Sequence, residues 1–124
     1  MDNYFRQKTG QRAEAFARAF LEAKGLQLIE HNYHCHYGEI DLIMLDEKDI
    51  VFIEVRCRKS TKYGNALESI NRTKMNKIIK TATHYLQRMK WLYTVNSRFD
   101  VIAIHPVAGK MRLEWFKNAF SVEN

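Results

Sequence analysis

The sequence lacks the usual features of membrane-spanning and disulfide-stabilised proteins. No apolar run approaches the roughly 18 residues that a transmembrane helix needs, and the N-terminus has no apolar signal-peptide core. The two cysteines, Cys35 and Cys57, make neither a disulfide framework nor a CxxC motif. The His- and Cys-containing residues 31–36 have no second spaced Cys/His pair to complete four zinc ligands. We therefore expect a cytoplasmic protein with free thiols and no membrane association.

The charge balance is basic. The 124 residues include 20 Lys and Arg against 14 Asp and Glu, which gives a net charge of +6 and a pI near 9.4. A small basic domain favours anionic partners, with nucleic acid first among them. The chain shows no internal repeat, linker or low-complexity segment, so it predicts a single domain over residues 1–124 with its core at about residues 8–120.

Two apolar, β-branched runs at residues 38–45 and 50–58 flank a polar break at residues 46–49, a pattern that predicts a β-hairpin. The predicted cross-strand partners are Leu45 with Ile50, Ile43 with Phe52, Asp41 with Glu54, and Glu39 with Arg56. Side chains alternate along a strand, so the opposite face of this hairpin is expected to be entirely apolar. That face comprises Ile40, Leu42, Met44, Val51, Ile53 and Val55.

The expected pairing sets two carboxylates against each other. Directly opposed side chains have Cβ atoms roughly 4.5–5.5 Å apart, where like charges destabilise a sheet. A divalent cation with oxygen ligands between Asp41 and Glu54 would remove this conflict. The alternative is a salt-bridged edge, in which Arg56 pairs with Glu39 and reaches Glu54 while Asp41 points at water.

Two amphipathic helices are predicted. Apolar residues recur at helical spacing over residues 8–24, and Glu14 lies at the margin of their buried stripe. Glu14 either points toward the hairpin carboxylates or is a first-turn acid favoured by the helix dipole. The second helix is expected at residues 72–89, with Asn71 as its N-cap.

A polar, basic loop separates the hairpin from the second helix. It contains Arg58, Lys59, Lys62 and Tyr63, and Arg72 and Lys74 follow at the helix start. These cations are candidates for phosphate contacts, and Tyr63 is a candidate for stacking on a base. The alternative is a solvated connector and helix face.

Three further strands are predicted at residues 26–33, 98–105 and 111–116, with Pro106 and the Gly109 turn ending the middle one. Asp100 is expected to bind a neighbouring Lys or Arg rather than a metal. A helix between the third and fourth strands implies a parallel, right-handed crossover. The fold class is therefore α/β, a mixed sheet with helices packed on it.

This order of elements, with Glu14, Asp41 and the Glu54-Val55-Arg56 segment, resembles the αβββαβ core of the restriction-endonuclease-like PD-(D/E)xK nucleases. The segments at residues 10–14, 38–43, 52–58 and 99–101 resemble more narrowly the YraN family. That family is described as predicted endonucleases similar to archaeal Holliday-junction resolvases.

The resemblance implies a metal-dependent endonuclease that hydrolyses phosphodiesters in branched or structured DNA, working as a homodimer. It implies that Asp41, Glu54 and the Val55 carbonyl hold Mg²⁺, or Mn²⁺ in its place, with Glu14, the acid of the N-terminal helix, as a further metal ligand. Arg56 replaces the usual lysine of the motif. Arginine cannot act as a base but can stabilise charge on a phosphorane. The alternatives are a nucleic-acid-binding protein that keeps the nuclease fold without turnover, and a basic module for an acidic protein.

Overall fold

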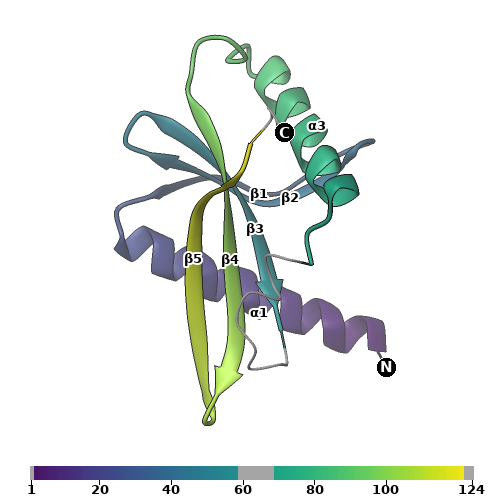
Figure 1. Cartoon of the computed structure of the whole chain (residues 1–124), viewed down its shortest axis with the longest axis vertical. Coiled ribbons are helices and arrows are strands. Elements are labelled where there is room, and N and C mark those ends of the chain that lie inside the picture. The colour runs from purple at the N-terminus through teal and green to yellow at the C-terminus, as the bar shows by residue number, and fades with distance from the viewer. Residues whose placement is uncertain (1, 59–68, 122–124) are drawn as a thin grey trace.

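The computed structural model describes residues 2–58 and 69–121 (Figure 1). In chain order its elements are α1 (Asp2–Ala23), β1 (Gln27–Cys35), β2 (Gly38–Asp46), β3 (Asp49–Cys57), α3 (Arg72–Arg88), β4 (Ser97–Val107) and β5 (Lys110–Phe120). This order confirms the predicted α/β succession of a helix, three strands, a helix and two strands. No helix in the described residues is long and apolar enough to cross a membrane.

The strands form one five-stranded mixed sheet in the order β1-β2-β3-β4-β5. β1, β2 and β3 make an antiparallel meander, β3 and β4 run parallel, and β5 returns antiparallel along β4. α3 lies in the connection between β3 and β4, as a parallel pair requires. The predicted meander and crossover are both confirmed.

The predicted hairpin register is confirmed where the ladder is regular. Ile43 pairs with Phe52 and Leu45 with Ile50, and the ladder reaches Leu42 opposite Ile53 before it ends. The ladder contains neither the expected pairing of Asp41 with Glu54 nor that of Glu39 with Arg56, because β2 leaves β3 at this point. Glu39 instead lies opposite His34 of β1, and Arg56 lies beside Ala103 of β4.

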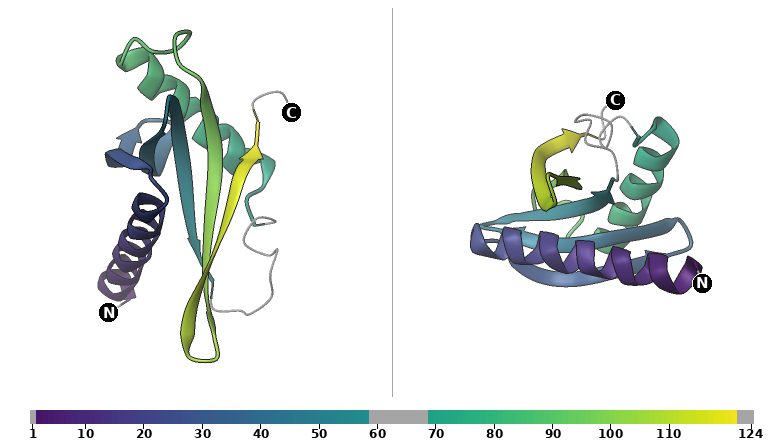
Figure 2. Two further views of the ribbon diagram at one scale, coloured as in Figure 1. Left: turned by 90° about the vertical axis from the view of Figure 1, so that its left-hand side faces the viewer. Right: turned by 90° about the horizontal axis from the view of Figure 1, so that it is seen from below.

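The helices cover opposite faces of the sheet (Figure 2). α1 packs on a cluster that includes Leu42, Met44, Val51 and Ile53, whereas α3 packs on one that includes Ile43, Phe52 and Tyr85. Val55 borders the first cluster, but Ile40 belongs to the second, so its predicted place on the all-apolar face is wrong. Strict alternation fails between Ile40 and Leu42, and Asp41 therefore lies at an irregular point of β2.

Some element boundaries differ from those predicted. α1 begins at Asp2 rather than near residue 8, and β5 continues to Phe120 rather than ending near residue 116. Pro106 lies inside β4, although it was expected to end that strand. β3 is paired with β4 only as far as Ile104, so beyond that point β4 pairs with β5 alone. Pro106, which has no backbone N–H, is tolerated there because β4 has lost its partner on one side.

Candidate functional site

The candidate site lies where β2 and β3 separate. The last paired residues are Leu42 and Ile53, so the backbone N–H of Val55 has no ladder partner on β2. The carboxylate of Asp41 takes that place, and its Oδ2 accepts a hydrogen bond from the Val55 N–H over 2.7 Å. The half-buried carboxylate of Asp41 thereby joins β2 to β3 at the point where the ladder between the two strands ends.

Two further carboxyl groups lie at Asp41. Glu14 reaches it from α1 and Glu54 from β3, and each of these carboxyls lies close enough to Asp41 for the Asp41 charge to raise its pKa. Glu54 is only 8 % exposed, although it is a charged residue. The three acids that sequence reasoning singled out therefore meet in space, although they come from three separate elements.

Burial changes the acidity of all three groups. It raises the pKa of Glu14 and of Glu54 to about 7 each, and repulsion from Asp41 adds to both shifts. Burial also raises the pKa of Asp41, which the hydrogen bond from Val55 only partly opposes. These carboxyls therefore keep their protons to a higher pH than isolated acids do, and a bound cation would relieve the same repulsion between them.

The donor set suits a hard divalent cation. Mg²⁺ is usually held by one or two carboxylates and keeps several water ligands. Asp41 and Glu54 provide two carboxylates, and the Val55 carbonyl belongs to the same strand junction. Within residues 2–58 and 69–121, no three His, Cys, Asp or Glu side chains form a ready metal-binding group. Glu14 is thus better described as the hydrogen-bonded neighbour of Asp41 than as a third ligand.

Two cations lie against the buried acid Glu54. The Nε atom of Arg56 is 3.3 Å from Glu54 Oε2, and Nζ of Lys74 is 3.7 Å from the same oxygen. Part of the salt-bridged alternative is therefore present, since Arg56 does reach Glu54. Its other parts are wrong, because Asp41 binds the Val55 N–H and Glu39 pairs with His34 over 3.4 Å.

Sequence reasoning missed Lys74 as a member of the acidic site and placed it only among contacts to DNA. The predicted N-cap is confirmed, because Asn71 Oδ1 accepts a hydrogen bond from the Lys74 N–H over 2.8 Å. In the sequence, this N-cap residue indicated where α3 begins and therefore that Lys74 lies in its first turn. The sequence contained no signal for where that turn lies relative to Glu54, because the crossover that carries it spans the sheet.

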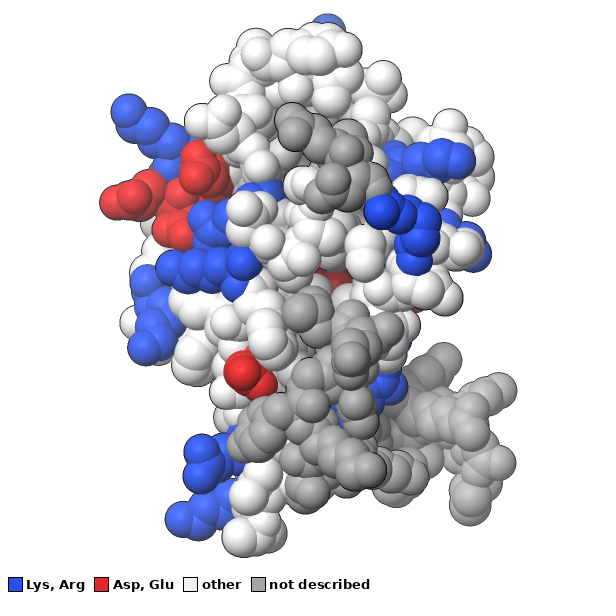
Figure 3. All heavy atoms as spheres, viewed as in Figure 1, with Lys and Arg blue, Asp and Glu red and all other residues white. Residues whose placement is uncertain are grey.

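The other predicted DNA contacts lie around the same end of α3. Arg58 donates a hydrogen bond to the side chain of Ser69, and Arg72 is exposed at the helix start. Lys59, Lys62 and Tyr63 lie outside the described residues. The sequence of α3 contains several Lys and Arg residues and no acid. Figure 3 shows Lys and Arg side chains over this helix, and others on the opposite side of the same face.

An open hollow adjoins this basic helix. It has a volume of about 380 Å³ and lies between the β1–β2 turn and α3. Its polar lining includes His34, Tyr37, Glu39, Lys74 and Lys77. Cations and an aromatic ring beside buried carboxylates are the groups that a nucleic-acid strand could contact with its phosphates and bases.

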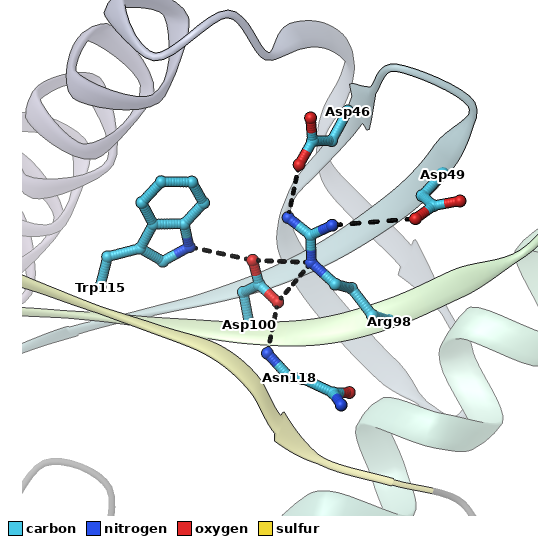
Figure 4. Close-up of polar contacts among 6 residues, drawn as sticks. All are labelled: Asp46, Asp49, Arg98, Asp100, Trp115 and Asn118. Atoms are coloured by element: carbon cyan, nitrogen blue, oxygen red, sulfur yellow. Dashed lines mark hydrogen bonds and ion pairs between the residues drawn. The ribbon is translucent and has the colours of Figure 1, made fainter.

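Asp100 belongs to a different cluster, as predicted. Arg98 Nε lies 3.0 Å from Asp100 Oδ1, and Arg98 also pairs with Asp46 over 2.8 Å (Figure 4). The indole N–H of Trp115 and the backbone N–H of Asn118 complete the partners of Asp100. These contacts join the β2–β3 turn to β4 and β5, so the structure assigns this acid to the scaffold.

Over the described residues, the fold and site define a class of protein, namely a mixed α/β domain with helices α1 and α3 packed on a five-stranded sheet and with three acids converging at a strand junction. The chain belongs to the Uncharacterised protein family UPF0102, whose family model matches residues 13–104. The matched stretch includes Glu14, Asp41, Glu54 and Lys74.

Bacterial relatives match over nearly the whole chain. A UPF0102 protein of Nitrosococcus oceani is 44% identical over 115 residues, which cover 93% of each chain. One from Pseudomonas syringae pv. syringae is 44% identical over 121 residues, covering 97% of this chain and 98% of its own. UPF0102 protein VP0448 of Vibrio parahaemolyticus is 39% identical over 121 residues, with 98% of both chains covered.

Proposed function

We propose that this protein is a metal-dependent endonuclease that hydrolyses phosphodiester bonds in branched or structured DNA. The observation that carries the proposal is the meeting of Glu14, Asp41 and Glu54 beside two cations. The resemblance to the YraN family and to PD-(D/E)xK nucleases supports the same reaction. DNA as substrate agrees with the net charge of +6 and the acid-free helix α3.

Asp41 and Glu54 are the residues proposed to hold Mg²⁺, with the Val55 carbonyl as a further oxygen donor. The bound ion would supply Lewis-acid polarisation of the scissile phosphate and a more acidic water. Glu14 keeps Asp41 in position through their shared hydrogen bond. Arg56 restrains Glu54 and adds positive charge where the phosphorane would form. By analogy with junction resolvases, we propose a homodimer acting in the cytoplasm.

The test is cleavage of labelled four-way junctions and matched linear duplexes in Mg²⁺ or Mn²⁺. We expect the wild type to cut the junctions, and Asp41→Asn and Glu54→Gln to lose at least a hundredfold in rate. Glu47→Gln is the matched control, because Glu47 is an exposed acid in the turn of the same hairpin. Cleavage that survives both substitutions would show that these acids do not hold the metal.

A second candidate function is DNA binding without turnover. It is favoured by Arg56, which occupies the position of the motif's lysine and has its Nε against Glu54. This function predicts salt-sensitive binding of junction DNA with no cleavage in Mg²⁺, Mn²⁺ or any other divalent ion. The cleavage assay above therefore separates the two candidates directly.

A further inference from the structure

We propose that Lys74, from the first turn of α3, supplies the cationic contact to the scissile phosphate and the attacking water. In the motif this contact usually comes from the lysine that Arg56 replaces in this chain. The proposal rests on the nuclease function above and deepens it. It assigns the substrate contact to a residue outside the hairpin motif. That residue belongs to α3, which lies in the connection between β3 and β4.

The position of Lys74 is fixed from two sides. Its backbone N–H donates to the Asn71 side chain at the N-cap, which holds the first turn of α3 in place. Its ammonium lies 3.7 Å from Glu54 Oε2, inside the acidic site. The side chain remains 38% exposed, so it borders the site without being enclosed by it. Lys74 also lines the open hollow beside α3, and it therefore lies between the acids and the space proposed for the DNA strand.

Arg56 is less suited to this contact. Its side chain is 22% exposed, against 38% for Lys74, and its Nε is buried against Glu54 in a geometry that forms no hydrogen bond. Arginine presents donors in a rigid planar fork, whereas an ammonium is a compact charge with three rotatable donors. One donor of Lys74 can stay on Glu54 while the other two bind a phosphate oxygen and a water.

The proposed step balances as an ordinary hydrolysis. The water oxygen forms a bond to phosphorus and one phosphodiester P–O bond breaks. The proton that the water loses goes to solvent, and the leaving oxygen gains a proton from solvent. Lys74 keeps its own protons throughout. It orients the water and neutralises charge that develops on the non-bridging oxygens.

The test compares Lys74→Met with Lys80→Met, which removes the same charge from the same helix. At about 100° per residue, Lys80 lies about 120° around α3 from Lys74, and it is exposed. Single-turnover cleavage of a four-way junction is measured in Mn²⁺ at saturating protein. Binding of the same junction is measured in Ca²⁺, and Mn²⁺ affinity by calorimetry.

We expect Lys74→Met to lower the cleavage rate by roughly 10²–10³-fold, the cost of losing one donor that stabilises transition-state charge. Its Mn²⁺ affinity should be equal to or higher than that of the wild type, because a positive charge beside Glu54 is gone. Lys80→Met should cleave within about twofold of wild type. Lys74→Arg should cleave faster than Lys74→Met. The double variant Lys74→Met with Arg56→Lys should cleave at least ten times faster than Lys74→Met alone.

The outcomes separate this proposal from the one that it rests on. If the wild type cleaves and Lys74→Met cleaves equally well, the assignment of Lys74 is wrong while the nuclease function stands. If Lys74→Met loses Mn²⁺ binding together with cleavage, Lys74 acts on the acids alone and the proposed substrate contact is wrong. A wild type that cleaves no junction in either metal ion overturns the nuclease function and this inference together.

Discussion

The surroundings of the Glu54 side chain act on its pKa in opposite directions. Burial and the nearby Asp41 favour its protonated form, whereas Lys74 and Arg56 favour its charged form. The first pair of effects dominates, and the pKa of Glu54 rises from 4.5 to about 7. In the metal-free protein this carboxyl therefore costs stability once it ionises, which links protein stability to pH.

The first prediction at this scale concerns Glu54→Gln in the presence of a chelator. The folded pKa of Glu54 exceeds the unfolded value, so its contribution to stability is complete below pH 4.5 and is lost as the pH rises through 7. Glutamine does not titrate. The free energy of unfolding of the variant should therefore rise relative to that of the wild type as the pH increases from 4.5 to 7. Above pH 7 the difference should be on the order of 3 kcal/mol.

Urea unfolding at several pH values between 4 and 8 measures this difference, and Glu47→Gln in the exposed turn serves as the control. A difference that does not change with pH would mean that the acidic cluster does not set the stability of the folded state. A variant less stable than the wild type at pH 8 would mean that Glu54 acts as a satisfied partner of its two cations.

At the scale of elements, Arg98 joins strands that are distant in sequence. It pairs with Asp46 and Asp49 at the two ends of the β2–β3 turn and with Asp100 on its own strand. Burial lowers the pKa of Arg98, but its bonds to Asp100 and Asp46 raise it by more. The cluster holds the far end of the hairpin, and it thereby supports the β2–β3 pair that carries the acidic site at its other end.

Asp100→Asn tests this support. Asp100 is 1% exposed, and removing one partner of a buried ion pair costs about 3–5 kcal/mol because the other charge is left without compensation. We expect a loss of about 3 kcal/mol in the free energy of unfolding by urea at pH 7. Asp49→Asn is the matched control. The Asp49 side chain is 42% exposed and lies 4.0 Å from Arg98, so this substitution should cost less than about 1 kcal/mol. Equal losses in the two variants would contradict a central role for Asp100.

Local sequence patterns predicted most of the elements and part of the site. The alternation in residues 38–58 gave the register of Ile43 with Phe52, and the Asn71 cap located the start of α3. These predictions depend on neighbouring residues alone. The separation of β2 from β3 at Asp41, and the partners of Lys74 and Arg98, depend on how distant elements pack. No periodicity carries that information, which is why Glu39 was assigned the wrong partner.

At the scale of the whole molecule, cations from several parts of the chain lie around the start of α3. Arg56 and Lys74 lie at the acidic site itself. Arg58, which contacts Ser69 just before α3, and Arg72 and Lys77, in the first turns of α3, add further positive charge at this end of the helix. Figure 3 shows Lys and Arg over this helix and also along the opposite side of the same face. A DNA backbone following this surface would bring a phosphate to Glu54, so binding and chemistry would use one continuous region.

The last prediction is the salt dependence of DNA binding, measured in Ca²⁺ with a duplex. Each phosphate contact contributes about 0.9 to the slope of log affinity against log salt concentration, so contacts from Arg58, Arg72, Lys74 and Lys77 predict a slope of about −3.6. Lys77→Met should reduce the magnitude of the slope by about 1, because it removes one contact from the hollow beside α3. Lys110→Met, at the first residue of β5, should leave it unchanged. Equal changes in both variants would show that DNA responds to net charge rather than to this surface.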